Sequence, residues 1–377
     1  MITEMARSVK KVMVAFGTRP EAIKLAPVVN ALKKISNLCT VTLITAQHRS
    51  MLDEMLKVFK IKVDYDLNIM KPKQKLTGMS SQIIRKLSPI YDRTKPDVLL
   101  IQGDTMSAFL CALVAFYKKI PIGHIEAGLR SYDKYAPFPE EVARRLISTL
   151  ADLHFAPTNN NRLNLISEGI NKSKIFVTGN TVVDALKSLK DKKFVPRFLS
   201  PILRKKTILV TAHRRENFGK PLINICHALK EITEKIKEIE IIYPVHPNPN
   251  VRDNVYRILK NIRRIHLIDP LNYVAFINVL ARSYLVLTDS GGIQEEAPVF
   301  GVPVLVLRNT TERPEVIKSG NAKLVGTEKK MIMNYVNKLV LKKDIYKKMA
   351  NPKSPYGDGK AAQRIVREVE RFLKKDE

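Results

Sequence analysis

Short apolar runs alternate with longer segments of helical periodicity along the chain, and this alternation limits the fold more than any other feature. Runs such as KVMVAFG (11–17) and DVLLIQGD (97–104) are apolar at successive positions, as strands buried on both faces are. Segments such as EAIKLAPVVNALKKI (21–35) place apolar residues at helical spacing instead. Strands of this kind, separated by helices, predict parallel sheets that helices cover on both faces.

The apolar runs fall into two sets, which predict two domains. The first set contains KVMVAFG (11–17), VTLITAQ (41–47), DVLLIQGD (97–104), PIGHIEA (121–127), LHFAPT (153–158) and IFVTGN (175–180). The second contains TILVTAH (207–213), EIIYPVH (240–246), IHLIDP (265–270), YLVLTDSG (284–291), PVLVLRN (303–309) and AKLVG (322–326). Between them, KDKKFVPRFLSPILRKK (190–206) has the charge and proline content of a connection. The sequence therefore predicts an α/β protein with two doubly wound Rossmann-like domains facing a central cleft.

Length and cysteine usage agree with this architecture. A chain of 377 residues exceeds the roughly 100–200 residues that one domain usually takes. No apolar run reaches the roughly 18–20 residues of a membrane span, and the N-terminus lacks a secretory signal pattern. Cys39, Cys111 and Cys226 lie far apart in apolar segments, which favours buried free thiols and a cytoplasmic location.

The formal net charge of +29 allows two interpretations. One is a nucleic-acid or other anionic partner, and the other is a set of solvated Lys and Arg side chains on helix faces. The basic residues are spread over the whole length, the chain has no Trp, and no aromatic series is interleaved with Arg. We therefore expect neither a nucleic-acid nor a membrane partner.

Polar residues collect where the apolar runs end. In doubly wound sheets, ligands bind beyond the carboxyl ends of the strands, so these residues are candidates for a binding site. They occur in both halves of the chain, at Gly17–Arg19, Gln47–Arg49, Gly103–Thr105, His124–Glu126, His213–Arg215, His246 and Asp289–Gly292.

The stretch LTDSGGIQEEAP (287–298) predicts a strand-to-helix turn that approaches an anion. Gly291 and Gly292 let the backbone come close to a bound group, and the N–H groups of a helix start favour an anion such as diphosphate. Glu295 or Glu296 is then either a helix-start residue that the helix dipole stabilises or a ligand for the two hydroxyls of a ribose. The combination points to a nucleotide.

FGTRPEAIK (16–24) repeats this pattern in the first half. Arg19 and Lys24 are candidate phosphate ligands, with ordinary helix-start and surface charge as the alternative. The segment is not a Walker loop, and no GxGxxG follows the first apolar run. A dinucleotide-binding site is therefore disfavoured.

Four carboxylates lie in three nearby segments, QGDT (102–105), GHIEAGLRS (123–131) and PFPEEVARR (137–145), and two of them, Asp104 and Glu126, end apolar runs. Asp104, Glu126 and Glu140 or Glu141 suit general acid/base chemistry if they share one site. The alternatives are helix capping by Asp104 and salt bridges from Glu140 or Glu141 to the arginines that follow.

AHRREN (212–217) places His213 beside two arginines at the expected start of the first helix of the second domain. His213 is a candidate phosphate ligand or acid. No Cys/His cluster has zinc spacing and no Asp-x-Asp pair occurs, so we expect no metal and no other cofactor.

Several motifs together resemble the non-hydrolysing UDP-N-acetylglucosamine 2-epimerases. They are FGTRPEAIK, TAQHR, GDT, GHIEAGLR, PFPEE, TGNTVVDAL, TAHRREN, YPVHPNPNVR, TDSGGIQEEAP, TTERPE and SPYGDG. The resemblance runs from about residue 11 to the C-terminus. It implies the glycosyltransferase-B fold, with residues 1–175 plus 360–377 as an N-terminal domain with a returning C-terminal helix, and 176–359 as a UDP-binding domain.

The resemblance also implies an activity and an assembly. It implies a cytoplasmic, homodimeric isomerase that interconverts UDP-N-acetylglucosamine and UDP-N-acetylmannosamine without metal or nicotinamide. UDP is eliminated from sugar carbon 1 as the carbon 2 proton leaves, and it adds back while carbon 2 is protonated from the other face. The alternative is an inverting UDP-sugar-dependent glycosyltransferase of the same fold, which would need an acceptor pocket.

The resemblance assigns roles to individual residues. Those implied to act in catalysis are Asp104, Glu126, Glu140 and His213. Phosphates are held by Arg19, Lys24, Ser290, Gly291 and Gly292, the ribose by Glu296, and the uracil by Leu271 and Phe276, with Arg313 supporting the nucleotide.

The chain also departs from the family pattern. Met106 and Ser107 follow GDT where threonines are usual, and Ala143 stands where an asparagine often precedes Arg144. Many bacterial members bind a second UDP-N-acetylglucosamine as an activator through a QHR stretch and a following glutamine. Gln47 and His48 are retained here, but Ser50 replaces that glutamine. We therefore expect an allosteric site at Gln47 and His48 that lacks one of its usual residues.

Overall fold

The chain forms two compact units. The computed structural model describes residues 9–46, 49–70, 74–135, 137–190, 194–311, 313–351 and 354–375. The N-terminal unit comprises Met1–Ala185 with Tyr356–Glu377, and the C-terminal unit comprises Leu186–Pro355. The N-terminal unit extends to Ala185 rather than to residue 175, because the strand ending at Val177 pairs with the strand before it.

In its described part, the N-terminal unit contains a seven-stranded sheet in the order β3-β2-β1-β4-β5-β6-β7, and every pairing in it is parallel. The strands are β1 Lys10–Phe16, β2 Leu38–Ile44, β3 Tyr65–Asp66, β4 Val98–Gln102, β5 Ile122–Ile125, β6 Leu153–Ala156 and β7 Ile175–Val177. Six of them match the first set of apolar runs. The two-residue strand β3 carries no apolar run and was not predicted.

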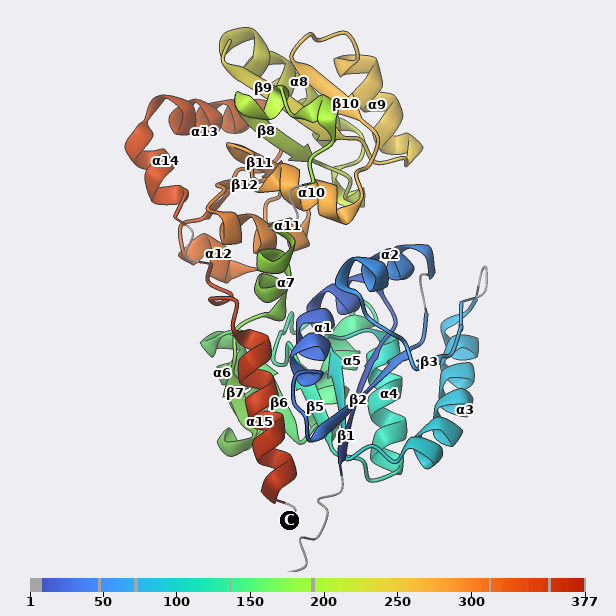
Figure 1. Cartoon of the computed structure of the whole chain (residues 1–377). Coiled ribbons are helices and arrows are strands. Elements are labelled where there is room, and N and C mark those ends of the chain that lie inside the picture. The colour runs from blue at the N-terminus through green and yellow to red at the C-terminus, as the bar shows by residue number, and fades with distance from the viewer. Residues whose placement is uncertain are drawn as a thin grey trace, which may run out of the picture. The chain divides into compact units, whose positions relative to one another are not determined.

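Helices connect these strands and pack in two rows. They are α1 Arg19–Leu32, α2 Arg49–Phe59, α3 Leu76–Thr94, α4 Met106–Tyr117, α5 Glu140–Leu150, α6 Asn159–Ser167, α7 Thr181–Lys190 and α15 Ala361–Lys375, with a 3-10 turn at Lys172–Lys174. Contacts join α3 to α4 and α4 to α5, and separately join α1 to α2 and to α15. The last helix of the chain, red in Figure 1, therefore covers the first unit beside α1.

The C-terminal unit repeats this topology. Its described sheet has six parallel strands in the order β10-β9-β8-β11-β12-β13. The strands are β8 Lys206–Thr211, β9 Ile239–Pro244, β10 Ile265–Ile268, β11 Leu285–Thr288, β12 Val304–Val306 and β13 Ala322–Leu324. All six match the second set of apolar runs, so the predicted pair of doubly wound sheets is confirmed.

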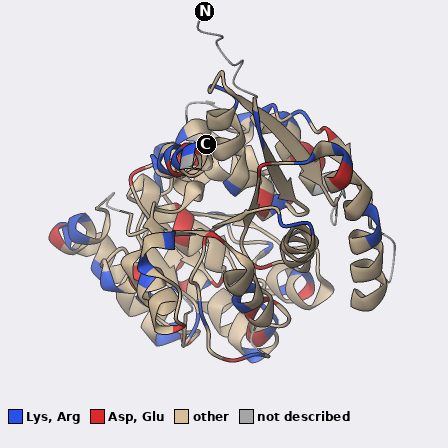
Figure 2. Cartoon of the chain, turned by 90° about the horizontal axis from the view of Figure 1, so that it is seen from below, with Lys and Arg blue, Asp and Glu red and all other residues tan. Residues whose placement is uncertain are grey.

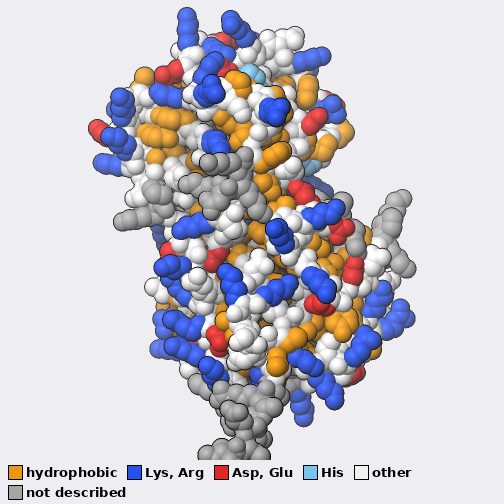
Figure 3. Space-filling model, viewed as in Figure 1, with side chains coloured by type: hydrophobic (Ala, Val, Ile, Leu, Met, Phe, Trp, Pro, Cys, Tyr) orange, Lys and Arg blue, Asp and Glu red, His pale blue; other side chains and the backbone are white. Residues whose placement is uncertain are grey.

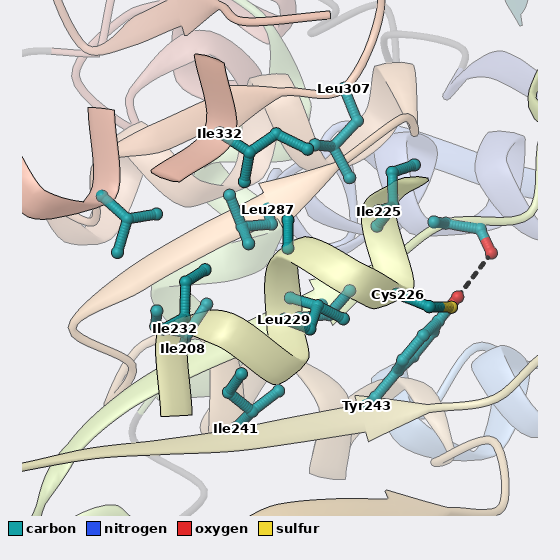
Figure 4. Close-up of a cluster of buried hydrophobic side chains, with 14 of the residues drawn as sticks. Ile208, Ile225, Cys226, Leu229, Ile232, Ile241, Tyr243, Leu287, Leu307 and Ile332 are labelled. Atoms are coloured by element: carbon teal, nitrogen blue, oxygen red, sulfur yellow. Dashed lines mark hydrogen bonds between the residues drawn. The ribbon is translucent and has the colours of Figure 1, made fainter. Parts of the chain in front are cut away.

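The helices of the C-terminal unit follow the same pattern. They are α8 Lys220–Lys235, α9 Pro249–Leu259, α10 Tyr273–Leu280, α11 Gly291–Glu296, α12 Pro314–Lys318, α13 Lys329–Leu341 and α14 Lys343–Met349, with 3-10 turns at Arg197–Leu199, Ile202–Arg204, Arg215–Asn217 and Ala297–Phe300. Figure 4 shows the core of this unit, where Ile225, Leu229 and Ile232 of α8 pack over the sheet. Tyr243 lies in this core and donates its hydroxyl hydrogen bond to the carbonyl of Ala212 at 2.9 Å.

The distribution of charge over the surface bears on the high net charge of the chain. On the face shown in Figure 3, Lys and Arg side chains are scattered among the other residues, and Figure 2 shows them on many separate helices. This arrangement fits the interpretation of the charge as solvated helix faces.

Among the described residues, no helix combines the length and apolar character that crossing a bilayer requires.

The cysteine prediction was only partly correct. Cys39, Cys111 and Cys226 are all free, but only Cys111 and Cys226 are buried. Cys39 lies near the start of β2 and is exposed, because β3 pairs only with Leu43 and Ile44 at the other end of that strand.

Two buried histidines face each other across neighbouring strands. His124 of β5 pairs in register with His154 of β6. Burial lowers the pKa of His124 to about 3 and that of His154 to about 4, and the nearby cations Arg130 and Lys174 act in the same direction. His124 Nε2 lies 2.8 Å from the carbonyl oxygen of Gly103, so the neutral ring donates from this nitrogen.

These histidines predict acid sensitivity. Their folded pKa values lie below the ordinary value of about 6.5, so stability is fully present above pH 6.5 and is lost as the pH falls toward the folded values. At pH 5 each histidine should cost about 2 kcal/mol of unfolding free energy, at roughly 1.4 kcal/mol per pH unit. The free energy of unfolding of His124→Asn, measured with urea, should therefore differ less between pH 7 and pH 5 than that of the wild type.

The control is His227→Asn, since His227 is exposed on α8. In this variant the free energy of unfolding should change between pH 7 and pH 5 by as much as in the wild type. An unchanged difference in His124→Asn would contradict the assignment of acid sensitivity to the buried ring.

Candidate functional site

The N-terminal unit has its switch point between β1 and β4, where the direction of strand order reverses. Ligands of doubly wound sheets bind beyond the strand ends at such a point. The turn after β1 contains Gly17, and a Cβ atom there would lie 2.1 Å from Thr45 Oγ1 and 2.9 Å from Ser107 Oγ. Only glycine fits this position, so the start of α1 sits tightly against the ends of the neighbouring strands.

A buried carboxylate joins the two loops of this switch point. Glu21 Oε2 accepts hydrogen bonds from the backbone N–H groups of Gly17 and Thr18, at 2.9 and 2.7 Å, and from the Thr18 hydroxyl at 2.8 Å. Its other oxygen accepts from the Thr105 hydroxyl, in the loop after β4, at 2.7 Å. Burial raises the pKa of Glu21, although these four donors oppose that shift. Glu21 was not predicted as a site residue.

Asp104 follows β4 and is held by the first turns of α5. Arg144 donates to Asp104 Oδ2 from Nε at 3.0 Å and also from its terminal nitrogen. The same guanidinium contacts Glu141 Oε2 at 3.0 Å. The alternative of Asp104 as a helix cap is wrong, because the Thr105 hydroxyl caps α4 by accepting from the N–H of Ala108. The salt bridge anticipated for Glu141 and Arg144 is present.

Glu126 follows β5, the neighbour of β4, and its carboxylate is almost fully buried, with 8% of the residue exposed. Three N–H donors bind its side chain. The Lys24 ammonium and Asn180 Nδ2 contact Oε1, the latter at 2.7 Å, and Gln102 Nε2 contacts Oε2. Glu126 also has a positive φ of 65°, a conformation that residues other than glycine rarely adopt.

The remaining predicted residues of this unit lie on α1 and α5, the helices whose Lys24 and Arg144 contact these two carboxylates. Glu140 is the first residue of α5, one turn before Arg144, and is half-buried. Arg19 begins α1 and is also half-buried. Within the described residues neither side chain forms a hydrogen bond or ion pair. Lys24, which was predicted as a phosphate ligand, is ion-paired with Glu126.

The C-terminal unit has its switch point between β8 and β11, and Asp289 at the end of β11 is its central residue. Asp289 is fully buried. Its Oδ2 accepts from the backbone N–H groups of His213 and Arg214, both at 2.8 Å, and from Asn217 Nδ2 at 3.0 Å. His213–Arg215 were expected at a helix start. His213 and Arg214 lie instead just before the 3-10 turn Arg215–Asn217, ahead of α8, and Asp289 fixes the backbone of these two residues.

The His213 ring lies between an acid and a second histidine. His213 Nδ1 is 3.6 Å from Asp289 Oδ1, and the ring stacks on His246 with centroids 5.4 Å apart and planes 8° from parallel. Partial burial lowers the pKa of His213, and Asp289 opposes this shift while His246 and Arg214 reinforce it. The ring therefore favours the neutral form near pH 7 and presents a partly exposed edge.

The turn after β11 begins the short helix α11 at the predicted glycines. Ser290 precedes Gly291 as the N-cap residue, and its N–H donates to Thr288 Oγ1 at 2.9 Å. The interpretation of Glu295 or Glu296 as a helix-start carboxylate is wrong, because α11 ends at Glu296. Each acid has its own partner instead.

These partners connect α11 to the other predicted nucleotide-binding residues. Arg313 Nε donates to Glu295 Oε1 at 2.7 Å. The Tyr273 hydroxyl donates to Glu296 Oε1 at 2.8 Å. Tyr273 begins α10, so this bond ties Glu296 to the segment that carries Leu271 and Phe276, both half-buried.

Sequence reasoning missed several residues that hold the predicted ones. Glu21 stands three residues after Thr18, a capping-box spacing that could have revealed it. Gln102 and Asn180 end apolar runs but bind Glu126 across 24 and 54 residues of sequence, which no local pattern indicates. The tentative allosteric residues Gln47 and His48 lie outside the described residues. The described part holds no group of three or more His, Cys, Asp or Glu side chains suited to one metal ion.

The sequence and fold match one family. The family model described as UDP-N-acetylglucosamine 2-epimerase matches residues 30–370. A putative UDP-N-acetylglucosamine 2-epimerase of Thermotoga maritima is 51% identical over 365 residues, covering 95% of this chain and 96% of that protein. The UDP-N-acetylglucosamine 2-epimerase of Escherichia coli K12 is 49% identical over 365 residues, covering 94% of this chain and 97% of that protein.

A solved structure extends the match to the fold. The crystal structure of UDP-GlcNAc 2-epimerase from Neisseria meningitidis, bound to UDP-GlcNAc, superposes with a TM-score of 0.86 at 47% identity, covering 96% of this chain and 100% of that one. The predicted glycosyltransferase-B fold is confirmed by this likeness. With a family model that spans most of its length and relatives near half identity, the chain belongs to the UDP-N-acetylglucosamine 2-epimerase family.

Proposed function

We propose that the protein is an isomerase that converts UDP-N-acetylglucosamine reversibly to UDP-N-acetylmannosamine. One observation carries this proposal. Asp104 and Glu126 follow neighbouring strands of the N-terminal sheet, and N–H donors hold both side chains at the strand ends where ligands of such sheets bind. The named activity of the relatives supports the choice of substrate.

The reaction needs elimination because the proton on sugar carbon 2 is not adjacent to a carbonyl group. We propose that a carboxylate removes this proton as the bond from carbon 1 to the UDP oxygen breaks. A double bond forms between carbons 1 and 2, giving 2-acetamidoglucal and UDP. The UDP oxygen then adds back to carbon 1 while carbon 2 receives a proton on the opposite face.

The carboxylates proposed for these transfers differ in their contacts. Asp104 is ion-paired with Arg144, and Glu126 is ion-paired with Lys24. Glu140 has no such cation within the described residues. The three carboxylates therefore differ in their charged neighbours, and a reaction that moves a proton between two faces needs both a base and an acid.

The UDP group is assigned to the loops at the switch points. We propose that His213 contacts the diphosphate, and that Arg19, Ser290, Gly291 and Gly292 supply further donors to it. Lys24 would have to share its ammonium group between a phosphate and Glu126. Glu296 is assigned to the ribose and Leu271 and Phe276 to the uracil, with Arg313 supporting them through Glu295.

We also propose that the protein acts as a homodimer in the cytoplasm, as the family resemblance implies. An allosteric site at Gln47 and His48 is part of the same proposal. Ser50, in place of the usual glutamine, should make activation by a second substrate molecule weaker than in relatives that retain it.

The first test uses UDP-N-acetylglucosamine as the only substrate in deuterated water. NMR should show new UDP-N-acetylmannosamine with deuterium at carbon 2, because the proton removed there exchanges with solvent. Product without deuterium at carbon 2 would exclude solvent-exchanged proton transfer. No conversion without an acceptor would favour the glycosyltransferase alternative.

The second test replaces the acid that follows β4. Asp104→Asn should bind UDP nearly as well as the wild type, while turnover falls by about 10²–10⁴, the usual contribution of proton transfer. Asp92→Asn is the matched control, because Asp92 is an exposed acid in the same unit and pairs only on the surface with Lys118. Full turnover in Asp104→Asn would remove this residue from the mechanism.

The third test concerns the loop that carries His213. Asp289→Asn removes the charged acceptor of two backbone N–H groups, an interaction worth about 1.5–3 kcal/mol. The Kd of UDP, measured by calorimetry, should therefore rise about 10- to 100-fold. Glu216→Gln should leave it nearly unchanged, since Glu216 lies in the adjacent turn and forms only a half-exposed pair with Arg308. Equal affinities in the two variants would refute the positioning of the loop by Asp289.

A further inference from the structure

Two motifs that the proposed chemistry leaves unused, TGN and YGDG, cross each other in the N-terminal unit. The N–H of Asn180 donates to the carbonyl of Tyr356 at 2.7 Å. Gly179 and Gly357 both have positive φ, at 87° and 117°. A Cβ on Gly357 would lie 3.2 Å from Gly179 Cα, and one on Gly179 would lie 3.1 Å from the Tyr356 carbonyl oxygen. Glycine at both positions lets the two backbones touch.

Side chains from both segments lock this crossing. Asp184 of α7 accepts from the N–H groups of Ala361 and Ala362 at the start of α15, at 3.2 and 2.9 Å. Arg364 of α15 donates to the carbonyl of Thr178 at 3.1 Å and forms an ion pair with Asp358 at 2.7 Å. The returning chain is thus bonded on both sides of Asn180.

The Asn180 side chain has one possible orientation in this setting. Asn180 is buried, with 3% exposed, and its Oδ1 accepts from the N–H of Val182 at 3.0 Å. The amide nitrogen must therefore point the other way, where it donates to Glu126 Oε1 at 2.7 Å. Both ends of the amide are fixed by partners of the correct type.

Glu126 depends on such partners because its backbone is strained. A positive φ at a residue other than glycine costs of the order of 1 kcal/mol or more and persists only when the surroundings fix it. Gln102 and Lys24 bind the carboxylate from β4 and α1, elements that the sheet holds in place. Asn180 comes instead from the segment just before the chain leaves this unit after Ala185, and it is bonded to the point where the chain returns at Tyr356.

We propose that Asn180 is a positioning residue for Glu126, and that the crossing of residues 178–181 with 356–358 sets the place from which it acts. This inference rests on the proposed role of Glu126 in proton transfer. Asn180 itself acts through Glu126, by holding Oε1 and keeping the carboxylate in its productive orientation. The TGN and YGDG motifs then serve one purpose, although they lie far apart in the sequence.

The direct test is Asn180→Asp. This substitution keeps the size of the side chain and the acceptor for Val182, but it replaces the donor with a second carboxylate oxygen facing Glu126. We expect kcat to fall roughly 10- to 100-fold, as a misplaced catalytic group would cause, with the KM of UDP-N-acetylglucosamine and the number of UDP sites per chain unchanged. The low-pH limb of the rate profile should move to higher pH, because a second carboxylate makes a bound proton harder to remove.

The charged groups around Glu126 already have partners, so a shift of the low-pH limb can be assigned to the new carboxylate at position 180. Lys24 of α1 is the cation that contacts it. Asp104 after β4 is paired with Arg144, Asp358 with Arg364, and Asp184 with two backbone N–H groups, while His124 of β5 is buried and neutral. A purely structural defect would lower the number of UDP sites and leave the pH profile in place.

Two further variants complete the experiment. Gly357→Ala disturbs the crossing without adding charge, so kcat should fall while the pH profile stays unchanged. Asn321→Asp is the matched control, because Asn321 is a buried asparagine of the C-terminal unit whose amide donates to backbone carbonyls. It should lower thermal stability but keep the wild-type kcat per UDP site.

The outcomes separate this inference from the proposed function. Wild-type kcat and pH profile in Asn180→Asp, or a loss explained entirely by fewer UDP sites, would overturn the positioning role. If Gly357→Ala does not fold, Asn180→Asp still decides. A wild-type protein that produces no UDP-N-acetylmannosamine would instead remove the proposed function, whatever the variants do.

Discussion

In each unit, a buried carboxylate accepts hydrogen bonds from backbone N–H groups and so holds the loops at the switch point. The other candidate residues of that unit depend on this carboxylate for their positions. In the N-terminal unit Glu21 collects donors from the turn after β1 and from the loop after β4. In the C-terminal unit Asp289 collects donors from the turn after β8. Parallel strands bring these turns to one edge, but they leave N–H groups there without partners in the sheet. The two acids satisfy these groups and thereby fix where the loops lie.

This arrangement also explains why acids are concentrated at the strand ends of a strongly basic chain. Asp104 and Glu126 follow strands, and each contacts a Lys or Arg side chain from another element. In the C-terminal unit Glu295 of α11 likewise contacts Arg313. A buried charge is tolerated only when it is paired and hydrogen-bonded. The cations therefore let the N-terminal unit keep two carboxylates close to its strand ends.

Much of the fold could be predicted from the sequence, whereas the contacts that orient the site could not. Apolar runs and helical spacing placed twelve strands in two sets, because burial on both faces leaves a clear pattern. The two-residue strand β3 left none, and without it the exposure of Cys39 at the sheet edge was missed. Helix limits also misled the interpretation of Glu295 and His213, since tertiary partners such as Arg313 and Asp289 fix them rather than helix geometry.

Glu126 shows where this limit lies. Its position after a strand could be read from GHIEAGLR, but its positive φ and its bond to Asn180 could not. The bond to Asn180 follows from a backbone crossing between residues 178–181 and 356–358, which glycine at positions 179 and 357 permits. A carboxylate in a strained conformation is stable only if distant residues hold it, so its environment is a property of the folded unit. The residues that define such a site are therefore partly those that carry no reactive group, and their recognition requires the structure.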